Sequence, residues 1–165
     1  MGRKERAKFC RLKLKRFLYL ISPNKIKINF YKDLEEVLSS NKVKYFQLRL
    51  KNYSFSSILK IGKKIKKITK KNKVKLIIND SIYIAKKLNS DGCHLGQSDG
   101  SITKAKIILK KRKIIGVTCH GSKKLILNAI KEKPNYLALG SFFKSKLKPN
   151  AKKAQKKLIK WTKRR

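Results

Sequence analysis

Short apolar runs alternate with longer amphipathic stretches along most of this sequence, and that alternation constrains its fold more than any other feature. We expect strands at 17–21, 43–50, 74–79, 92–95, 113–117 and 136–139. We expect helices at 31–39, 54–71, 81–88, 102–111, 125–130 and 152–161. Runs that are apolar on both faces are typical of parallel strands covered by helices. Six such units, without a glycine-rich dinucleotide loop after the first strand, favour an α/β fold of the (β/α)-barrel type over a doubly wound sheet.

Length and composition fit one folded domain. With 165 residues, 41% of them apolar, the chain can bury a core of its own. No apolar run approaches the ~20 residues that span a bilayer, and no small-residue cleavage site follows the apolar run at 17–21. We expect a cytoplasmic protein without a membrane partner, with a basic N-terminal tail at 1–16 and the folded domain at 17–165.

The charge is strongly positive, with 47 Lys and Arg against 8 Asp and Glu, or +39 net. Many basic groups favour binding to polyanions through counterion release. The lysines are spread over almost every expected helix, however, and do not gather on one face among aromatic residues. We therefore expect non-specific attraction to nucleic acid, and a specific nucleic-acid function is the less favoured alternative.

The cysteines are Cys10, Cys93 and Cys119, an odd number without a Cys-x-x-Cys pair. This pattern favours reduced, buried thiols over disulfides or a zinc site. Cys119 lies beside His120, which could activate a thiol, so a nucleophilic cysteine is an alternative. It is the less favoured one.

Polar side chains gather where the expected strands end. In a barrel, functional groups lie at the carboxyl ends of the strands. Those ends carry Arg49, Lys51, Asn79, Asp80, His94, Gln97, Asp99, Thr118, His120, Ser145 and Lys148. The opposite ends offer mainly lysine and asparagine, so we expect one rim of the barrel to hold the site.

Asp80 and Asp99 follow two successive expected strands. An unpaired buried carboxylate is costly, but two neighbouring strand exits can present both carboxylates to one cation. Mg²⁺ suits such a pair, because it prefers oxygen ligands, keeps several waters and is shared with substrate phosphates. The alternative is that each aspartate caps the helix that follows it.

Cations and amides at the same rim suit a phosphorylated heterocycle. Arg49 can hold a phosphate with two hydrogen bonds, and Lys51 and Lys148 offer point charges. Gln47 and Asn79 can read the edge of a heterocycle, or alternatively bond to loop backbone.

Six motifs carry a resemblance to a known family. They are LYLISP at 18–23, QxRxK at 47–51, IND at 78–80, DGxHLGQxD at 91–99, IGVTxH at 115–120 and YxxLG at 136–140. In order and spacing, over about residues 17 to 163, the chain resembles thiamine-phosphate synthase and its thiazole tautomerase relatives.

The resemblance implies a TIM barrel of thiamine biosynthesis. Such an enzyme joins the small-molecule substrates, a pyrimidine methyl pyrophosphate and a thiazole phosphate, and releases pyrophosphate with the help of Mg²⁺. Asp80 and Asp99 would bind the metal. The implied catalytic residues are Arg49, Lys51, Thr118 and Lys148. The implied substrate contacts come from Gln47, Arg49, Lys51, Asn79, Thr118, Ser145 and Lys148.

The sequence departs from the family at two places. In the loop at 140–148, Ser145 can replace one threonine hydroxyl of the family, whereas Leu147 cannot replace the other. The resemblance also implies a seventh and an eighth strand beyond residue 165. We therefore expect an incomplete TIM barrel of about six βα units with the last two missing. Exposed edges would then cause marginal stability, self-association and little or no turnover.

Two alternative functions remain. A thiazole tautomerase-like enzyme would use His120 as acid and base. A non-catalytic remnant or polyanion-binding protein would account for the missing strands and the charge.

Overall fold

The computed structural model describes residues 17–110, 112–143 and 153–164, and strands alternate with helices through this part. The strands are β1 Leu18–Ile21, β2 Val43–Leu48, β3 Lys75–Asn79, β4 Gly92–Leu95, β5 Ile114–His120 and β6 Tyr136–Leu139. The helices are α1 Phe30–Ser39, α2 Phe55–Lys71, α3 Ile82–Leu88, α4 Ile102–Leu109, α5 Lys123–Lys131 and α6 Lys157–Thr162. The alternation expected from the sequence is confirmed. The expected tail at 1–16 lies outside the described residues.

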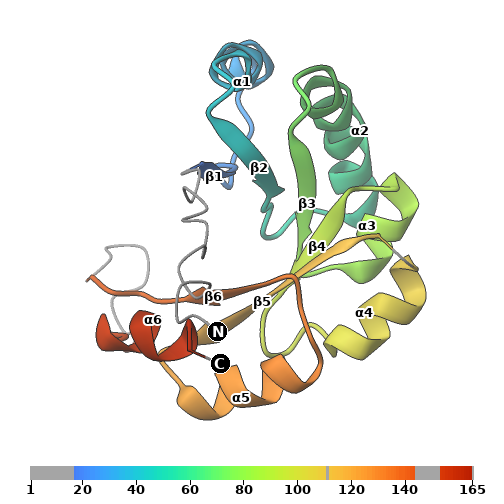
Figure 1. Ribbon diagram of the computed structural model, residues 1–165. Helices are drawn as coiled ribbons and strands as arrows, with labels where there is room; N and C mark the ends of the chain where they lie inside the picture. The colour runs from blue at the N-terminus through green and yellow to red at the C-terminus, as the bar shows by residue number, and fades with distance from the viewer. Residues whose placement is uncertain (1–16, 111, 144–152, 165) are drawn as a thin grey trace, which may run out of the picture.

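The strands form one parallel sheet in the order β1-β2-β3-β4-β5-β6. Figure 1 shows the sheet curling, with helices along its outer side. The curl brings the side chains of the two outer strands into contact. The hydroxyls of Tyr19 in β1 and Tyr136 in β6 are 2.6 Å apart. The fold is thus an incomplete (β/α) barrel, as expected.

The core lies between the outer face of the sheet and the helices. Alternate strand residues supply one side of it, since successive side chains point to opposite faces. Its fully buried members include Phe46, Leu48, Leu76, Ile78, Leu95 and Ile115 from strands, and Leu38, Ile65 and Ile126 from helices. The other strand face turns to the interior of the curl, where polar and aromatic side chains such as Gln47, His94 and Tyr136 lie beside aliphatic ones such as Ile21.

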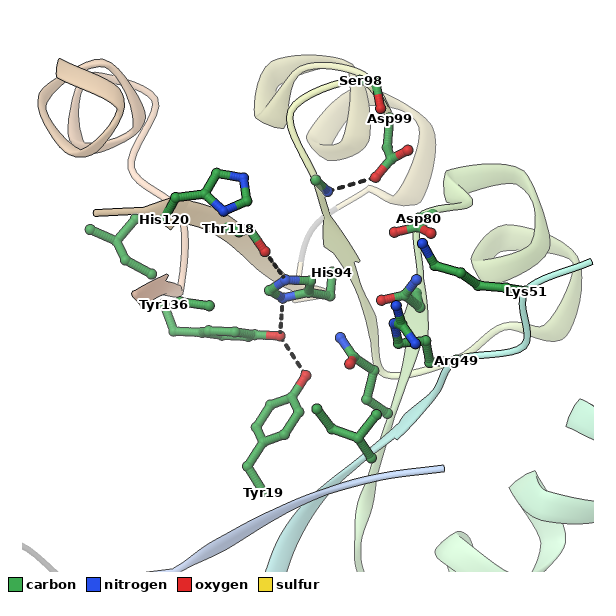
Figure 2. A pocket seen from close by; sticks show the side chains of 16 residues that line it. Tyr19, Arg49, Lys51, Asp80, His94, Ser98, Asp99, Thr118, His120 and Tyr136 are labelled. Carbon is green, nitrogen blue, oxygen red and sulfur yellow. Dashed lines mark hydrogen bonds between the residues drawn. The ribbon is translucent and has the colours of Figure 1, made fainter. Parts of the chain in front are cut away.

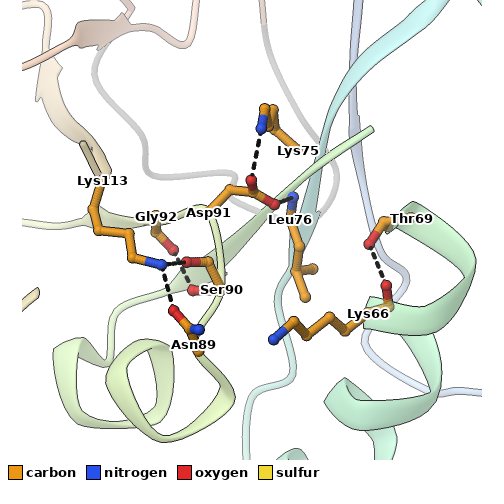
Figure 3. A network of polar contacts seen from close by, with 9 residues as sticks. All are labelled: Lys66, Thr69, Lys75, Leu76, Asn89, Ser90, Asp91, Gly92 and Lys113. Atoms are coloured by element: carbon orange, nitrogen blue, oxygen red, sulfur yellow. Dashed lines mark hydrogen bonds and ion pairs between the residues drawn. The ribbon is translucent and has the colours of Figure 1, made fainter. Parts of the chain in front are cut away.

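Polar contacts at the amino ends of the strands hold the sheet together (Figure 3). Asp91 accepts hydrogen bonds from the Leu76 N–H and from the Lys75 Nζ, both at 2.9 Å. Lys113 donates to the carbonyl of Ser90 at 2.7 Å. These contacts join β3, β4 and β5 at the end away from the expected site, so they serve the fold.

Most elements begin or end one to a few residues from the expected positions. β2 ends at Leu48 and not at residue 50, β5 continues to His120, and the last helix covers Lys157–Thr162. Arg49 leaves the sheet because its N–H donates to the hydroxyl of Ser22, at 2.9 Å, in the loop after β1.

None of the helices in the described ranges is long and apolar enough to cross a membrane.

Candidate functional site

A cavity of about 630 Å³ opens inside the curl at the carboxyl ends of the strands. Each of the six strands contributes to its lining, through Tyr19, Gln47, Asn79, His94, Thr118 and Tyr136. Figure 2 shows Tyr19, His94, Thr118 and Tyr136 around one space, with Arg49, Lys51, Asp80 and Asp99 on one side of it. The carboxyl ends of the six strands therefore surround a cavity in this chain.

Most of the residues singled out from the sequence meet in this cavity. Its lining includes Gln47, Arg49, Lys51, Asn79, Asp80, Asp99, Thr118 and His120. Ser145 and Lys148 lie outside the described residues. The roles of all these residues stay predictions at this point.

Asp80 lies just beyond β3 in a left-handed backbone conformation, with φ of 65°. Its N–H donates to the carbonyl of His94 at 2.8 Å, which fixes the turn against β4. Burial raises the pKa of Asp80 from 3.8 to about 6, and the nearby Asp99 carboxylate adds to this, while Lys51 and Arg49 oppose it. Burial and Asp99 thus outweigh the two cations, and the ionised form of Asp80 is disfavoured in the ligand-free site.

Asp99 braces its own loop, because its Oδ2 accepts a hydrogen bond of 2.6 Å from the Gly96 N–H. Neither aspartate caps a helix. The caps of α3 and α4 are Ser81 and Ser101, whose hydroxyls accept the N–H groups of Ile84 and Lys104. The capping alternative is therefore wrong, and neither carboxylate is used by the helix that follows it.

A hard divalent cation fits this donor set. The two carboxylates are close enough for one to raise the pKa of the other, which is what a shared cation would relieve. Within the described part of the chain no three His, Cys, Asp or Glu side chains are grouped closely enough to hold a metal. Two carboxylates suit a cation that keeps waters and takes further oxygens from its substrate.

The cations are placed by loop contacts. Beyond β2, the Lys51 N–H donates to the Asn24 side chain at 2.7 Å, and Ser22 holds the backbone of Arg49. Figure 2 shows both cationic side chains beside Asp80. This segment therefore faces the acidic pair because the loop after β1 turns it there.

Tyr19 and Tyr136 are cavity residues that the sequence reasoning missed. Both lie in apolar runs, whose pattern predicts strands but no functional role for these two side chains. Their hydroxyls bond to each other, and the Tyr136 hydroxyl is also 2.9 Å from His94 Nδ1. An aromatic residue with a polar end on the inward face of a strand was the available signal.

The cysteine alternative does not fit the structure. Cys119 is fully buried, and its Sγ faces the carbonyl of Leu125 at 3.7 Å, on the helix side of the sheet. Burial raises the pKa of Cys119 to about 11 and that of Cys93 to about 12. Both stay protonated thiols, free of disulfides, so the expectation of reduced, buried thiols is confirmed for these two residues.

The family follows from a sequence comparison. The family model described as thiamine monophosphate synthase matches residues 18–165. The chain belongs to the thiamine monophosphate synthase family. This membership confirms the resemblance carried by the strand-end motifs, and the cavity lies where those motifs end.

Several members of the thiamine monophosphate synthase family are similar to the chain. It is 59% identical over 135 residues to thiamine-phosphate synthase of Pelagibacter ubique (strain HTCC1062), covering 81% of this chain and 65% of that protein. It is 37% identical over 148 residues to thiamine-phosphate synthase of Erythrobacter litoralis (strain HTCC2594), covering 87% and 70%.

A solved structure gives the same result for the fold. Thiamine phosphate pyrophosphorylase from Pyrococcus furiosus matches with a TM-score of 0.68 at 29% identity, over 78% of this chain and 62% of that one. The chain therefore spans a little under two thirds of the length of this protein and of the Pelagibacter relative.

Proposed function

We propose that this chain acts as a thiamine-phosphate synthase-like transferase of thiamine biosynthesis. It would join a pyrimidine methyl pyrophosphate to a thiazole phosphate and release pyrophosphate. The observation that carries this proposal is the pairing of Asp80 and Asp99 beside Arg49 and Lys51, at one cavity of a chain in this family.

Asp80 and Asp99 are proposed to hold Mg²⁺. When bound, the metal would stabilise the negative charge that develops on the departing pyrophosphate. Arg49 would bind phosphate oxygens through two N–H groups, and Lys51 would add a point charge. These cations favour the departing pyrophosphate more than the intact substrate, because the charge grows as the bond breaks.

The reaction breaks one bond and forms one. The C–O bond of the pyrimidine methyl group breaks, and its electron pair leaves with pyrophosphate. The lone pair of the thiazole nitrogen then forms a C–N bond to the methyl cation. No strong base is needed, which agrees with a site rich in charged and amide groups.

The neutral groups are proposed to orient the reactants. Gln47 is buried, and together with Asn79 and Thr118 it lines the cavity and would contact the pyrimidine. Ser145 would contact the thiazole phosphate, and Lys148 would contact the substrate and assist its reaction. Correct orientation of the two substrates supplies much of the rate acceleration in such transfers.

The alternatives are less favoured. The family model and the relatives above are those of thiamine-phosphate synthases, which speaks against a tautomerase that uses His120 and against a non-catalytic remnant. The cytoplasmic location and the merely non-specific attraction to nucleic acid stay predictions.

A single-turnover assay tests the proposal. Protein in excess over the pyrimidine methyl pyrophosphate is incubated with thiazole phosphate and Mg²⁺, and thiamine phosphate is quantified by chromatography. We expect Mg²⁺-dependent product from the parent, background product from each of the single variants Asp80→Asn and Asp99→Asn, and retained product from the control Asp91→Asn, which removes the same charge. Equal product from the three variants would overturn the assigned site. No product, together with no Mg²⁺-dependent binding of the pyrimidine pyrophosphate, would overturn the function.

A further inference from the structure

The loop after β1 continues the pairing of β1 with the chain beyond β2. The Ser22 N–H donates to the carbonyl of Gln47 at 2.9 Å, as in a regular parallel ladder. The next bond of such a ladder would run from the Arg49 N–H to the backbone carbonyl of Ser22. Here the Ser22 hydroxyl takes the place of that carbonyl, at 2.9 Å. The same hydroxyl donates to the Arg49 carbonyl at 3.3 Å, so one side chain holds both backbone polar groups of Arg49.

A second side chain repeats this contact two residues further along. The Asn24 Oδ1 accepts the Lys51 N–H at 2.7 Å. Pro23 lies between the two contacts and has no N–H to offer. Serine and asparagine are residues whose short side chains commonly bond to backbone in turns. The pairs 22–49 and 24–51 keep one register, so the two contacts form a side-chain ladder of two steps.

The side-chain ladder holds a segment that carries two cations. Leu50 packs against the hydrophobic core, whereas Arg49 and Lys51, on either side of it, line the cavity. This is the alternation of an extended segment. Figure 2 shows both cationic side chains beside Asp80. The backbone of residues 49–51 therefore decides where the two charges meet a ligand.

The two steps of the side-chain ladder differ in burial. Ser22 is buried, so its contact also serves the fold. Asn24 and Lys51 are exposed, so water could take over the Lys51 N–H at little cost in stability. Asn24 is not among the described residues that line the cavity. An effect of Asn24 on a bound anion would therefore pass through the position of Lys51.

We propose that Asn24 is a positioning residue for Lys51 in the pyrophosphate site. This inference rests on the proposed function, because it takes Lys51 to bind the pyrophosphate group of the substrate. A backbone that is already held in place lets a long side chain meet its ligand with a smaller loss of conformational freedom. Asn24 thus contributes to affinity without touching the substrate.

Calorimetric titration with the pyrimidine methyl pyrophosphate and Mg²⁺ tests this role. We expect Asn24→Ala to weaken binding about threefold, as loss of one hydrogen bond does, and to leave the urea midpoint of unfolding nearly unchanged. Asn29→Ala is the matched control, because Asn29 is an exposed asparagine between β1 and α1 whose side chain forms no capping hydrogen bond. It should bind like the parent. A loss in Asn24→Ala no larger than that in Asn29→Ala would overturn the proposal.

A double-mutant cycle tests whether Asn24 acts through Lys51. Asn24→Ala should cause no further loss of affinity in the Lys51→Ala background, because the side chain that it positions is gone. In the Arg49→Ala background it should still weaken binding about threefold. A general loosening of the loop would give the same loss in both backgrounds, and that result would overturn the proposal.

The contact itself is tested without ligand. Amide hydrogen exchange followed by NMR should show the Lys51 N–H exchanging about tenfold faster in Asn24→Ala than in the parent, and at the parental rate in Asn29→Ala. An unchanged rate in Asn24→Ala would overturn the positioning role. If the parent does not bind the pyrimidine methyl pyrophosphate, the proposed function fails, whereas the exchange rate still decides whether Asn24 holds Lys51.

Discussion

Asp80 carries a carboxyl group whose pKa is raised in the folded protein. Burial and the nearby Asp99 raise its pKa from 3.8 to about 6. Between about pH 4 and about pH 6 the folded chain therefore binds more protons at this group than the unfolded chain does. By linkage, this group makes the free energy of unfolding of the ligand-free protein fall as pH rises through that window.

Asp80→Asn should remove this decline. We expect the stability of the parent to fall relative to that of Asp80→Asn as pH rises from about 4 to about 6, because only the parent must ionise a buried carboxyl. Urea unfolding of both proteins at several pH values measures the difference. A difference that is constant with pH, or that grows in favour of the parent, would show that the pKa of Asp80 is not raised.

Arg49→Ala should weaken pyrophosphate binding by about tenfold or more, because it removes a guanidinium that forms charge-assisted hydrogen bonds. Lys67→Ala removes equal charge from an exposed position of α2 and should change affinity little. Lys66 is the poorer control, since its Nζ donates to the carbonyl of Leu88. Calorimetric titration with pyrophosphate and Mg²⁺ compares the two variants. Equal losses would indicate diffuse electrostatics.

Some residues of the site can be predicted from the local sequence pattern and others cannot, for a physical reason. Asp80 and Asp99 stand out because each is a carboxylate within a few residues of the end of an apolar run. Tyr19 and Tyr136 do not, because their pairing spans 117 positions in the chain and depends on how far the sheet curls. Their polar ends matter only once β1 and β6 face each other.

At the scale of elements, the two ends of the sheet use the same residue type differently. Asp91 at the amino ends accepts from Leu76 and Lys75, whereas the aspartates at the carboxyl ends face the cavity. Asp91→Ala should therefore lower the free energy of unfolding by about 1–3 kcal/mol, because the partly buried Leu76 N–H loses its acceptor. Pyrophosphate affinity should not change. Unchanged stability, or a loss confined to ligand binding, would contradict this division.

Element type was predictable here, and element ends were less so. The order of strands and helices follows from apolar periodicity, which is local. The end of β2 does not, because the Arg49 N–H is taken by Ser22 from another loop. A partner 27 residues away in sequence leaves no mark in the local pattern.

At the scale of the whole molecule, the outer strands are open in the described structure. There β1 pairs with β2 alone and β6 with β5 alone. Phe17, Leu18 and Ile21 are 48%, 56% and 50% exposed. An exposed apolar edge strand is a template for pairing with another chain.

We therefore predict that the 165-residue chain self-associates as its concentration rises. Leu18→Lys, which puts a charge on the β1 edge, should shift the chain toward the monomer. Light scattering coupled to size-exclusion chromatography measures this over a range of loading concentrations. A parent that stays monomeric throughout and unfolds cooperatively would contradict the prediction.

The central claim is that the curl assembles a metal-dependent pyrophosphate site from separate strand ends. Calorimetric titration with the pyrimidine methyl pyrophosphate, with and without Mg²⁺, tests it most directly on the parent, Asp80→Asn, Asp99→Asn and Asp91→Asn. We predict Mg²⁺-dependent binding in the parent and in Asp91→Asn, weakened about tenfold or more in Asp80→Asn and Asp99→Asn. Binding that is independent of Mg²⁺, or equally affected by all three substitutions, would contradict the claim.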